Sequence, residues 1–486
     1  MSQEYPEVGL KRGRFAVSLF WSYAEMKEKD RRMFLLSTAI ISLCFLLTST
    51  GYLAWTYNVM GLTVPGMAEA VSLVAGYLLQ AAGIGFFVIL LRRKKACADQ
   101  AAAVGLILYI LCLVPAALSS SFMTVSVTGF LLNLWSGWIA GYYLYQLTDM
   151  TPARARGMAL GAGYGVSIVL SWLFTLPEGG SVYDSKWILA ICLFLTAAVF
   201  VVIRIKCADG KDRDETVTDE LRELLFLKAL PLRSLLIPAA ALVLVFSILN
   251  SSGFGFPSVH LQEGIRVETS RLFYAAGLVI AGFVHDRDRR YGALCALAAL
   301  VMPFMLLALR GEPVPLRIFW ALSYFSFGFY SVYRMLLFSD IAKAENMLWL
   351  SGCGLLAGRI GDALGEAMNL LLLKSAPALI GLCAALFVTA VILFFRIYRS
   401  AWLPDTEQDR SEQERFDRFS AQYDLSSRER EVLRMLLLKK TNMEIAEELS
   451  VSERTVRFHI HNLLQKTGCR NRVVLLSAYT LQQDVT

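Results

Sequence analysis

The sequence predicts an all-α protein: a polytopic membrane bundle of twelve helices, divided six plus six, followed by a small four-helix domain. Composition is the first observation behind this prediction, because 56% of the 486 residues are hydrophobic and only 18% are charged. Soluble globular chains are usually ~45–50% apolar and ~25% charged. The second observation is that the apolar residues form runs long enough to cross a bilayer, which takes ~20 residues. This composition excludes a disordered chain, a collagen and a small disulfide-rich secreted protein.

Twelve apolar runs follow a basic N-terminal tail, residues 1–32, in which we expect no cleavable signal peptide. The first membrane half is predicted at residues 33–205, with runs centred on Met33–Trp55, Met67–Leu91, Ala98–Leu118, Phe122–Leu147, Gly157–Leu176 and Lys186–Ile205. The second half is predicted at residues 234–395, with runs centred on Ser234–Phe256, Ser270–Val284, Gly292–Leu309, Pro315–Phe338, Met347–Leu373 and Ala376–Phe395. The run Ser270–Val284 is short for a membrane span.

Lysine and arginine are concentrated in alternate connections between these runs. The N-terminal tail, the segment 92–95 and the long central loop 206–233 are rich in them, whereas the connections between are poor. Basic residues mark the cytoplasmic side of a membrane protein. We therefore expect a multi-pass protein of the bacterial cytoplasmic (inner) membrane, with the lipid bilayer as a partner and both termini in the cytoplasm.

The connection between the eighth and ninth runs carries a recognisable pattern: Gly282, then Asp286 with Arg287, then Arg290. Together with the six-plus-six division, this pattern resembles the major facilitator superfamily. The resemblance implies that the glycine permits close helix packing and that the charges form a cytoplasmic latch. Arg289 stands where that superfamily usually has glycine, and the corresponding loop of the first half lacks the aspartate.

Run eleven places three ionisable side chains near the middle of a predicted span. Arg359, Asp362 and Glu366 are three and four residues apart, so they share one helical face. A charge at this depth costs ~2.5–3.5 kcal/mol on the insertion scale and usually faces the bundle interior. The cluster is a ligand site or charge lock between two states, or else a structural ion pair. The same helix has glycines at small-xxx-small spacing, which are expected to permit close packing or to act as a hinge: Gly354, Gly358, Gly361 and Gly365.

Aromatic side chains crowd two other runs, one around Trp135 and one around Tyr324. They are suited to line a pocket for an aromatic or amphipathic ligand. The alternative is a set of rings at the membrane interface or against lipid. Arg334, which follows the second cluster, is a counter-charge for an acidic ligand or else reaches the cytoplasmic headgroups.

The composition changes abruptly after Phe395. Residues 396–424 are charged and predict a part-helical cytoplasmic linker with a candidate docking stripe of Phe416, Phe419 and Tyr423. Residues 425–486 predict a soluble domain of four short helices, with apolar residues at helical spacing. The polar residues expected to cap the first three helices are Ser426 or Ser427, Thr441 or Asn442, and Ser452. The third helix is expected from Glu453 to about Thr467, with Gly468 at its end, and the fourth from about Asn471 to Leu481.

The second helix, a tight turn at residues 450–452 and the third helix form a predicted helix-turn-helix. The start of the third helix exposes Arg454, Arg457, Phe458 and His461. An arginine can bond guanine bidentately in the major groove, and an apolar ring can contact the thymine methyl. Double-stranded DNA is therefore the expected partner, and a helical domain without DNA binding is the alternative. Further basic side chains are placed to reach phosphates: Lys466, Arg470 and Arg472.

The stretch from Ser426 to Arg472 resembles the LuxR-type DNA-binding domain. The matching residues are Arg428–Leu433, Asn442, Glu444–Ala446, Ser452, Thr455–Arg457, His459, Asn462 and Lys466. The resemblance implies that bases are read by Arg457, Phe458 and His461. It also implies that the DNA backbone is contacted by Arg454, Thr455 and Lys466, and that the active domain forms a homodimer through its fourth helix. His461 stands where the family often has lysine, so the base preferred there is open.

The whole arrangement is similar to a group of bacterial one-component regulators that have a twelve-helix membrane domain and a LuxR-type tail. This resemblance implies a membrane-bound transcriptional regulator, whose membrane domain senses an unidentified small-molecule ligand and controls sequence-specific DNA binding. One alternative is a major-facilitator-type transporter with a regulatory DNA-binding tail, and another is an inert membrane anchor for that tail. The residues expected to bind the ligand or couple it to the tail are Arg359, Asp362, Glu366, Trp135 and Tyr324.

No enzymatic activity is expected. The four histidines form neither a catalytic triad nor a metal-binding spacing, and the cysteines are scattered singly. No phosphate-binding glycine loop precedes a helix in a soluble segment. The sequence therefore predicts no catalytic residue, no metal site and no cofactor.

Overall fold

The computed structural model describes residues 26, 28–62, 67–93, 97–174, 185–209, 233–260, 267–302, 304–305, 313–372, 375–402, 415–437, 440–449 and 451–481. Within these ranges every regular element is a helix, so the predicted all-α class is confirmed for the described part of the chain. The chain forms two compact units, Met1–Trp402 and Leu403–Thr486.

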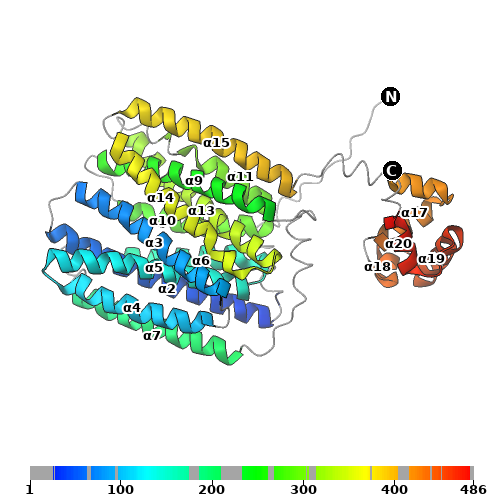
Figure 1. The fold of residues 1–486 in the computed structure, drawn as a ribbon, viewed down its shortest axis with the longest axis horizontal. Coiled ribbons are helices and arrows are strands. Elements are labelled where there is room, and N and C mark those ends of the chain that lie inside the picture. The colour runs from blue at the N-terminus through cyan, green and yellow to red at the C-terminus, as the bar shows by residue number, and fades with distance from the viewer. Residues whose placement is uncertain are drawn as a thin grey trace. The chain divides into compact units, whose positions relative to one another are not determined.

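The first unit is a bundle of long helices (Figure 1). Its N-terminal half holds α2 (Glu28–Leu62), α3 (Met67–Arg93), α4 (Ala98–Leu118), α5 (Phe122–Met150), η2 (Ala153–Ala155), α6 (Arg156–Leu173) and α7 (Ser185–Asp209). Its C-terminal half holds α9 (Arg233–His260), α10 (Val267–Arg287), α11 (Arg289–Ala299), α13 (Pro313–Ala344), η3 (Leu348–Gly352), α14 (Cys353–Leu372) and α15 (Ala376–Trp402). Each of the twelve predicted apolar runs contains one of these α-helices.

Among the described residues, seven helices are long and apolar enough to cross a membrane: α2, α3, α4, α5, α7, α9 and α15. The other helices are shorter, less apolar or more charged. In α14, for example, Arg359, Asp362 and Glu366 interrupt the apolar sequence, and Asp362 is buried inside the bundle rather than on its surface. A membrane crossing by all twelve runs therefore stays a prediction.

Two helices differ from the predicted runs. The ninth run was expected to be helical over Gly292–Leu309, but α11 ends at Ala299. Residues 302 and 304–305 are helical again, so the run is interrupted after Ala299. The eleventh run starts with a separate 3₁₀ turn, η3, which comes after Asn346 in the left-handed region at φ 53°.

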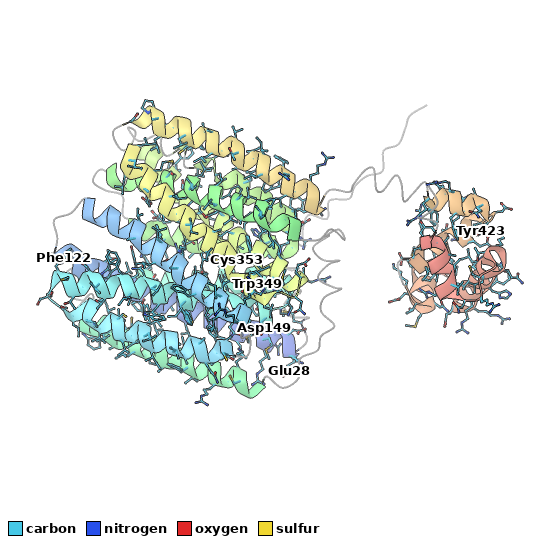
Figure 2. All side chains as sticks on the ribbon, in the orientation of Figure 1. Glu28, Phe122, Asp149, Trp349, Cys353 and Tyr423 are labelled. Carbon is cyan, nitrogen blue, oxygen red and sulfur yellow. The ribbon has the colours of Figure 1, made fainter. Side chains whose placement is uncertain are left out.

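The two halves of the bundle interlock rather than stand side by side. One hydrophobic core is built from α2 to α7 and also takes in buried residues of α10, α13 and α14. The second core is built from α9, α11, α13, α14 and α15. Trp349 and Cys353, both labelled in Figure 2, pack against both cores. The boundary between the halves is therefore a packed interface with shared side chains.

Glycines let helix backbones touch, both across this interface and within the second half. A Cβ atom added to Gly157 in α6 would lie 2.3 Å from the carbonyl oxygen of Gly282 in α10. On α14, a Cβ atom at Gly361 would lie 2.5 Å from the carbonyl oxygen of Leu244 in α9. Any larger residue would push the helices apart, so the prediction that these glycines permit close packing is confirmed.

The second unit is a small helical domain around a core of its own. Its labelled helices are α17 (Ser427–Leu437), α18 (Asn442–Glu448), α19 (Glu453–Thr467) and α20 (Arg472–Leu481). A further helical segment, residues 415–422, precedes them. This segment buries Phe416 and Phe419 in the same core, and the Phe419 ring lies 5.2 Å from that of Tyr479 in α20. The aromatic stripe predicted in the linker is thus part of the C-terminal unit.

Each labelled helix of this unit begins at a side-chain cap. Ser426 and Glu429 form a reciprocal pair at the start of α17: the Ser426 N–H donates to Glu429 Oε2 at 2.8 Å, and the Glu429 N–H donates to Ser426 Oγ at 3.3 Å. Thr441 makes the same exchange at α18, and Ser452 Oγ accepts the Thr455 N–H at α19. The open choices in the sequence are thereby settled in favour of Ser426 and Thr441. Gly468 ends α19 at φ 67°, where a left-handed residue is needed.

Candidate functional sites

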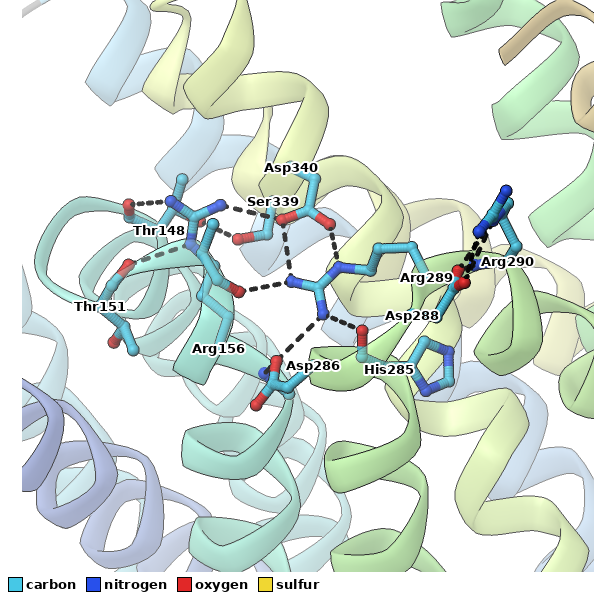
Figure 3. Close-up of polar contacts among 12 residues, drawn as sticks. Thr148, Thr151, Arg156, His285, Asp286, Asp288, Arg289, Arg290, Ser339 and Asp340 are labelled. Carbon is cyan, nitrogen blue, oxygen red and sulfur yellow. Dashed lines mark hydrogen bonds and ion pairs between the residues drawn. The ribbon is translucent and has the colours of Figure 1, made fainter. Parts of the chain in front are cut away.

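A network of buried charges joins the two halves at the start of α6 (Figure 3). Arg156, which is fully buried, donates to Asp340 Oδ1 at 2.9 Å, and Arg289 donates to Asp340 Oδ2 at 2.7 Å. Arg289 also reaches Asp286 at 3.0 Å. The Asp286 carboxylate accepts the backbone N–H groups of Gly157 and Met158, each at 2.7 Å. A negative charge is thus placed at the positive N-terminal end of α6.

The loop charges that the sequence resemblance assigns to a latch take part in this network. Asp286 does bind the other half of the bundle, but its side-chain partner is Arg289, the residue that replaces the usual glycine. Arg290 pairs locally with Asp288 at 2.7 Å. The roles of Arg156 and Asp340 were not predicted from the sequence, because charged residues near a predicted loop resemble ordinary surface charges.

A cavity of about 360 Å³ lies inside the bundle between the two halves. Its walls come from α2, α3, α5 and α6 on one side and from α10, α13 and α14 on the other. A second cavity, of about 240 Å³, shares several of these walls and extends toward the charged face of α14. The residues common to both are Phe45, Tyr77, Tyr274, Tyr324, Phe327, Leu355 and Arg359.

The charges predicted in run eleven line this space. Asp362 Oδ2 accepts from Arg359 Nη1 at 3.2 Å and from Arg334 Nη1 at 3.3 Å. Glu366 accepts a hydrogen bond from Ser251 Oγ at 2.9 Å. The guanidinium of Arg359 also lies 5.2 Å from the ring centroid of Tyr77, a favourable cation–π distance.

The structure brings Arg359, Asp362, Glu366 and Tyr324 together at these cavities. Trp135 stays outside the group: its ring lies 5.9 Å from that of Trp138, and it lines neither cavity. Arg334 was expected either to act as a counter-charge for an acidic ligand or to reach the cytoplasmic headgroups. In the structure it is buried beside Asp362. Three residues that line the first cavity were not predicted from the sequence: Tyr77, Arg271 and Tyr274. No other feature of their part of the sequence marked them as functional.

The helix-turn-helix of the second unit presents one polar face of α19. Val456 and Leu463 point into the core, as the 3.6-residue period predicts. The residues of the opposite face are exposed, and they are Arg454, Arg457, Phe458 and His461. Phe458 is 60% exposed and lies among these polar side chains. The Arg457 guanidinium lies 2.6 Å from Glu453 on the surface.

Thr455 and Lys466 have partners inside the domain. Thr455 Oγ1 lies 2.8 Å from Ser452 Oγ at the start of α19. Lys466 Nζ donates to the Asp424 carbonyl oxygen at 2.7 Å and to Glu429 Oε2 at 2.8 Å, and so ties the end of α19 to the start of α17. Burial raises the pKa of Glu429, but the hydrogen bonds from Lys466 and Ser426 outweigh it and hold the pKa below its ordinary value.

A helix-turn-helix with exposed arginines and an exposed ring on its second helix is characteristic of a DNA-binding domain of transcription regulators. Residues 424–478 match the family model of bacterial regulatory proteins of the luxR family. The C-terminal domain is therefore a LuxR-type helix-turn-helix domain, and LuxR-type regulators bind DNA.

The C-terminal domain is similar to several curated proteins, two of which are named as transcriptional regulators. Over 48 residues the chain is 54% identical to the spore germination protein GerE of Bacillus subtilis (strain 168), covering 10% of this chain and 65% of that protein. Over 53 residues it is 42% identical to the CsgBAC operon transcriptional regulatory protein of Escherichia coli (strain K12), covering 11% of this chain and 24% of that protein. Over 49 residues it is 45% identical to the transcriptional activator protein AnoR of Acinetobacter nosocomialis, covering 10% and 21%. The chain thus spans less than two thirds of each, and the similarity lies in the C-terminal domain.

Proposed function

We propose that the protein is a membrane-bound transcriptional regulator, in which the helical bundle senses a small molecule and controls DNA binding by the C-terminal domain. The observation that supports this most is the LuxR-type helix-turn-helix in the same chain as an apolar bundle with an internal cavity. In this proposal the bundle lies in a bacterial cytoplasmic membrane with both termini in the cytoplasm. Coupling requires a ligand that binds two states of the bundle with different affinity.

On the DNA side, Arg457, Phe458 and His461 would read bases. Arg454 and Thr455 flank them near the start of α19, where phosphates of the groove edge come close. Lys466 would contact the DNA backbone in one of two ways. It would give up one of its present hydrogen bonds, or it would donate an ammonium hydrogen that those bonds do not use. A homodimer through α20 would place two such helices on successive half-sites.

The experiment is recovery of bound DNA from cells by crosslinking and immunoprecipitation of the full-length protein. Wild type is compared at equal level with the double variant Arg457→Ala, His461→Ala and with the control Arg428→Ala, which removes an exposed arginine of α17. We expect a compact set of promoter fragments with wild type and control, and its loss with the double variant. On a recovered fragment, Arg457→Ala alone should weaken binding by ~1–3 kcal/mol. Equal recovery by all three proteins would contradict the proposal.

The cavity between the halves also favours a second candidate, a transporter with a regulatory DNA-binding tail, because a site between two half-bundles would serve either function. The two candidates differ in net flux. A compound that changes DNA occupancy should accumulate in membrane vesicles only if the protein transports it. Accumulation that is lost in Arg359→Gln vesicles would favour the transporter.

A further inference from the structure

The cavities inside the bundle carry an excess of positive charge. Arg271, Arg334 and Arg359 line them, whereas the carboxylates are Asp362 and Glu366. Asp362 is the shared partner of both Arg334 and Arg359, so one negative charge serves two positive ones. Glu366 accepts from Ser251 and pairs with no arginine among the described residues. The side chains that line the cavities therefore include more arginines than carboxylates.

The two arginines beside Asp362 differ in accessibility. The Arg334 side chain is 6% exposed and is also hydrogen-bonded to the Tyr330 hydroxyl at 3.0 Å, whereas the Arg359 side chain is 23% exposed. Arg359 is moreover the charged residue common to both cavities. An entering group would therefore meet Arg359 first, while Arg334 keeps Asp362 in place.

An unused donor lies in the same cluster. Arg334 Nε is buried and has no hydrogen-bond partner in the part of the chain that the structure describes. A buried donor without a partner costs free energy, and such groups are rare unless a ligand or water satisfies them. This donor shows that the hydrogen-bonding capacity of Arg334 is not used up by Asp362 and Tyr330.

The remaining walls indicate the body of the ligand. Rings surround the space on several helices: Phe45, Tyr77, Tyr274, Tyr324 and Phe327. Flat apolar faces with a few hydroxyl groups suit an aromatic or other unsaturated body. A cavity of about 360 Å³ is within the usual range for small-molecule sites.

We propose that the cavity binds a small aromatic monoanion, of the carboxylate class, whose acid group pairs with Arg359. Arginine and carboxylate form short, charge-assisted and often bidentate hydrogen bonds. The acid group of the ligand competes with Asp362 for Arg359. Ligand binding therefore changes the ion pair between Arg359 and Asp362 on α14, the helix that packs on both α3 and α9. This inference rests on the proposed sensing function and names the class of molecule sensed.

The test uses the purified full-length protein in lipid nanodiscs and probes that differ only in charge. They are benzoate, benzamide and benzylammonium, and the corresponding 2-naphthyl set, each titrated while thermal unfolding is followed. We expect an acid to raise the unfolding midpoint and to bind about tenfold more tightly than its amide, because a charge-assisted hydrogen bond is roughly twice as strong as a neutral one. Arg359→Gln should abolish the difference between acid and amide, and Arg93→Gln, at the exposed end of α3, should preserve it.

Equal shifts with amide or amine, an acid response that survives Arg359→Gln, or no response to either acid would each overturn the inference. If Arg359→Gln does not fold, Arg359→Lys replaces it: the preference for the acid should persist with weaker binding. DNA occupancy in cells separates this failure from that of the proposed function. If anions do not bind but promoters are still occupied through Arg457, only the inference about the ligand is lost.

Discussion

On α19, residues two positions apart meet opposite environments. Val456 is fully buried in the domain core, while Phe458 is 60% exposed beside Arg457. Helical periodicity alone predicts this contrast, because both faces of the helix can be read from the spacing of apolar residues. Beside an exposed arginine on a helix-turn-helix, such a ring is suited to contact thymine methyl groups in the major groove.

Glu429 should make the stability of the C-terminal unit depend on pH. Its pKa is held below the ordinary value, so its carboxylate stabilises the fold fully above the unfolded-state pKa, and this contribution is lost as pH falls through the folded-state pKa. We expect Glu429→Gln to lower the free energy of unfolding of the fragment 403–486 by about 1–2 kcal/mol at pH 7, because Lys466 loses a charged acceptor. The deficit should shrink toward pH 3 in urea titrations.

Glu431→Gln is the matched control for Glu429→Gln. Glu431 pairs with Arg428 at 2.7 Å, but both side chains are about half exposed, and exposed pairs contribute at most ~1 kcal/mol. A deficit in Glu429→Gln that is the same at pH 7 and pH 3 would show that packing, and not the ionised carboxylate, is what the variant loses.

At the scale of the elements, the helical segment 415–422 is attached to the C-terminal unit by its two phenylalanines. We expect Phe419→Ala to destabilise the fragment 403–486 by about 3–5 kcal/mol, the usual cost of removing a buried phenylalanine, because its side chain is 1% exposed and packs edge-to-face against Tyr479. Thermal or urea unfolding measures this loss. Phe458→Ala serves as the control: it should leave stability within about 0.5 kcal/mol and impair DNA binding instead. Similar unfolding midpoints for the two variants would contradict the assigned packing.

The elements themselves could largely be predicted from the sequence, since their signals are local. Apolar runs mark the long helices, and Ser426, Thr441 and Ser452 mark helix starts in the C-terminal unit. Signals that depend on distant residues could not be predicted. The hydrogen bond from Lys466 to Glu429 joins two helices through residues 37 positions apart, and no periodic pattern in the sequence predicts it. The cavity residues were predicted only where charges at membrane depth or clustered aromatic rings marked them, as at Arg359 and Tyr324.

At the scale of the whole bundle, the halves are held together by backbone contact at glycines and by one shared carboxylate. Asp340 pairs with Arg156 of the first half and with Arg289 of the second. Arg156 and Asp340 are 184 residues apart in the chain, which is why the sequence alone did not connect them. Such a network favours one arrangement of the halves, because any motion that separates α6 from α10 leaves buried charges without partners.

Asp340→Asn should therefore destabilise the full-length protein, and the size of the effect tests whether this carboxylate serves two arginines. Removing one partner of a buried ion pair typically costs ~3–5 kcal/mol, and here two guanidinium groups lose their acceptor together. Thermal unfolding in nanodiscs should show a lower midpoint. Asp288→Asn is the control. The Asp288 side chain pairs with Arg290 and caps α11, and asparagine caps a helix equally well. If both variants melt like wild type, the charge network has no part in fixing the arrangement of the halves.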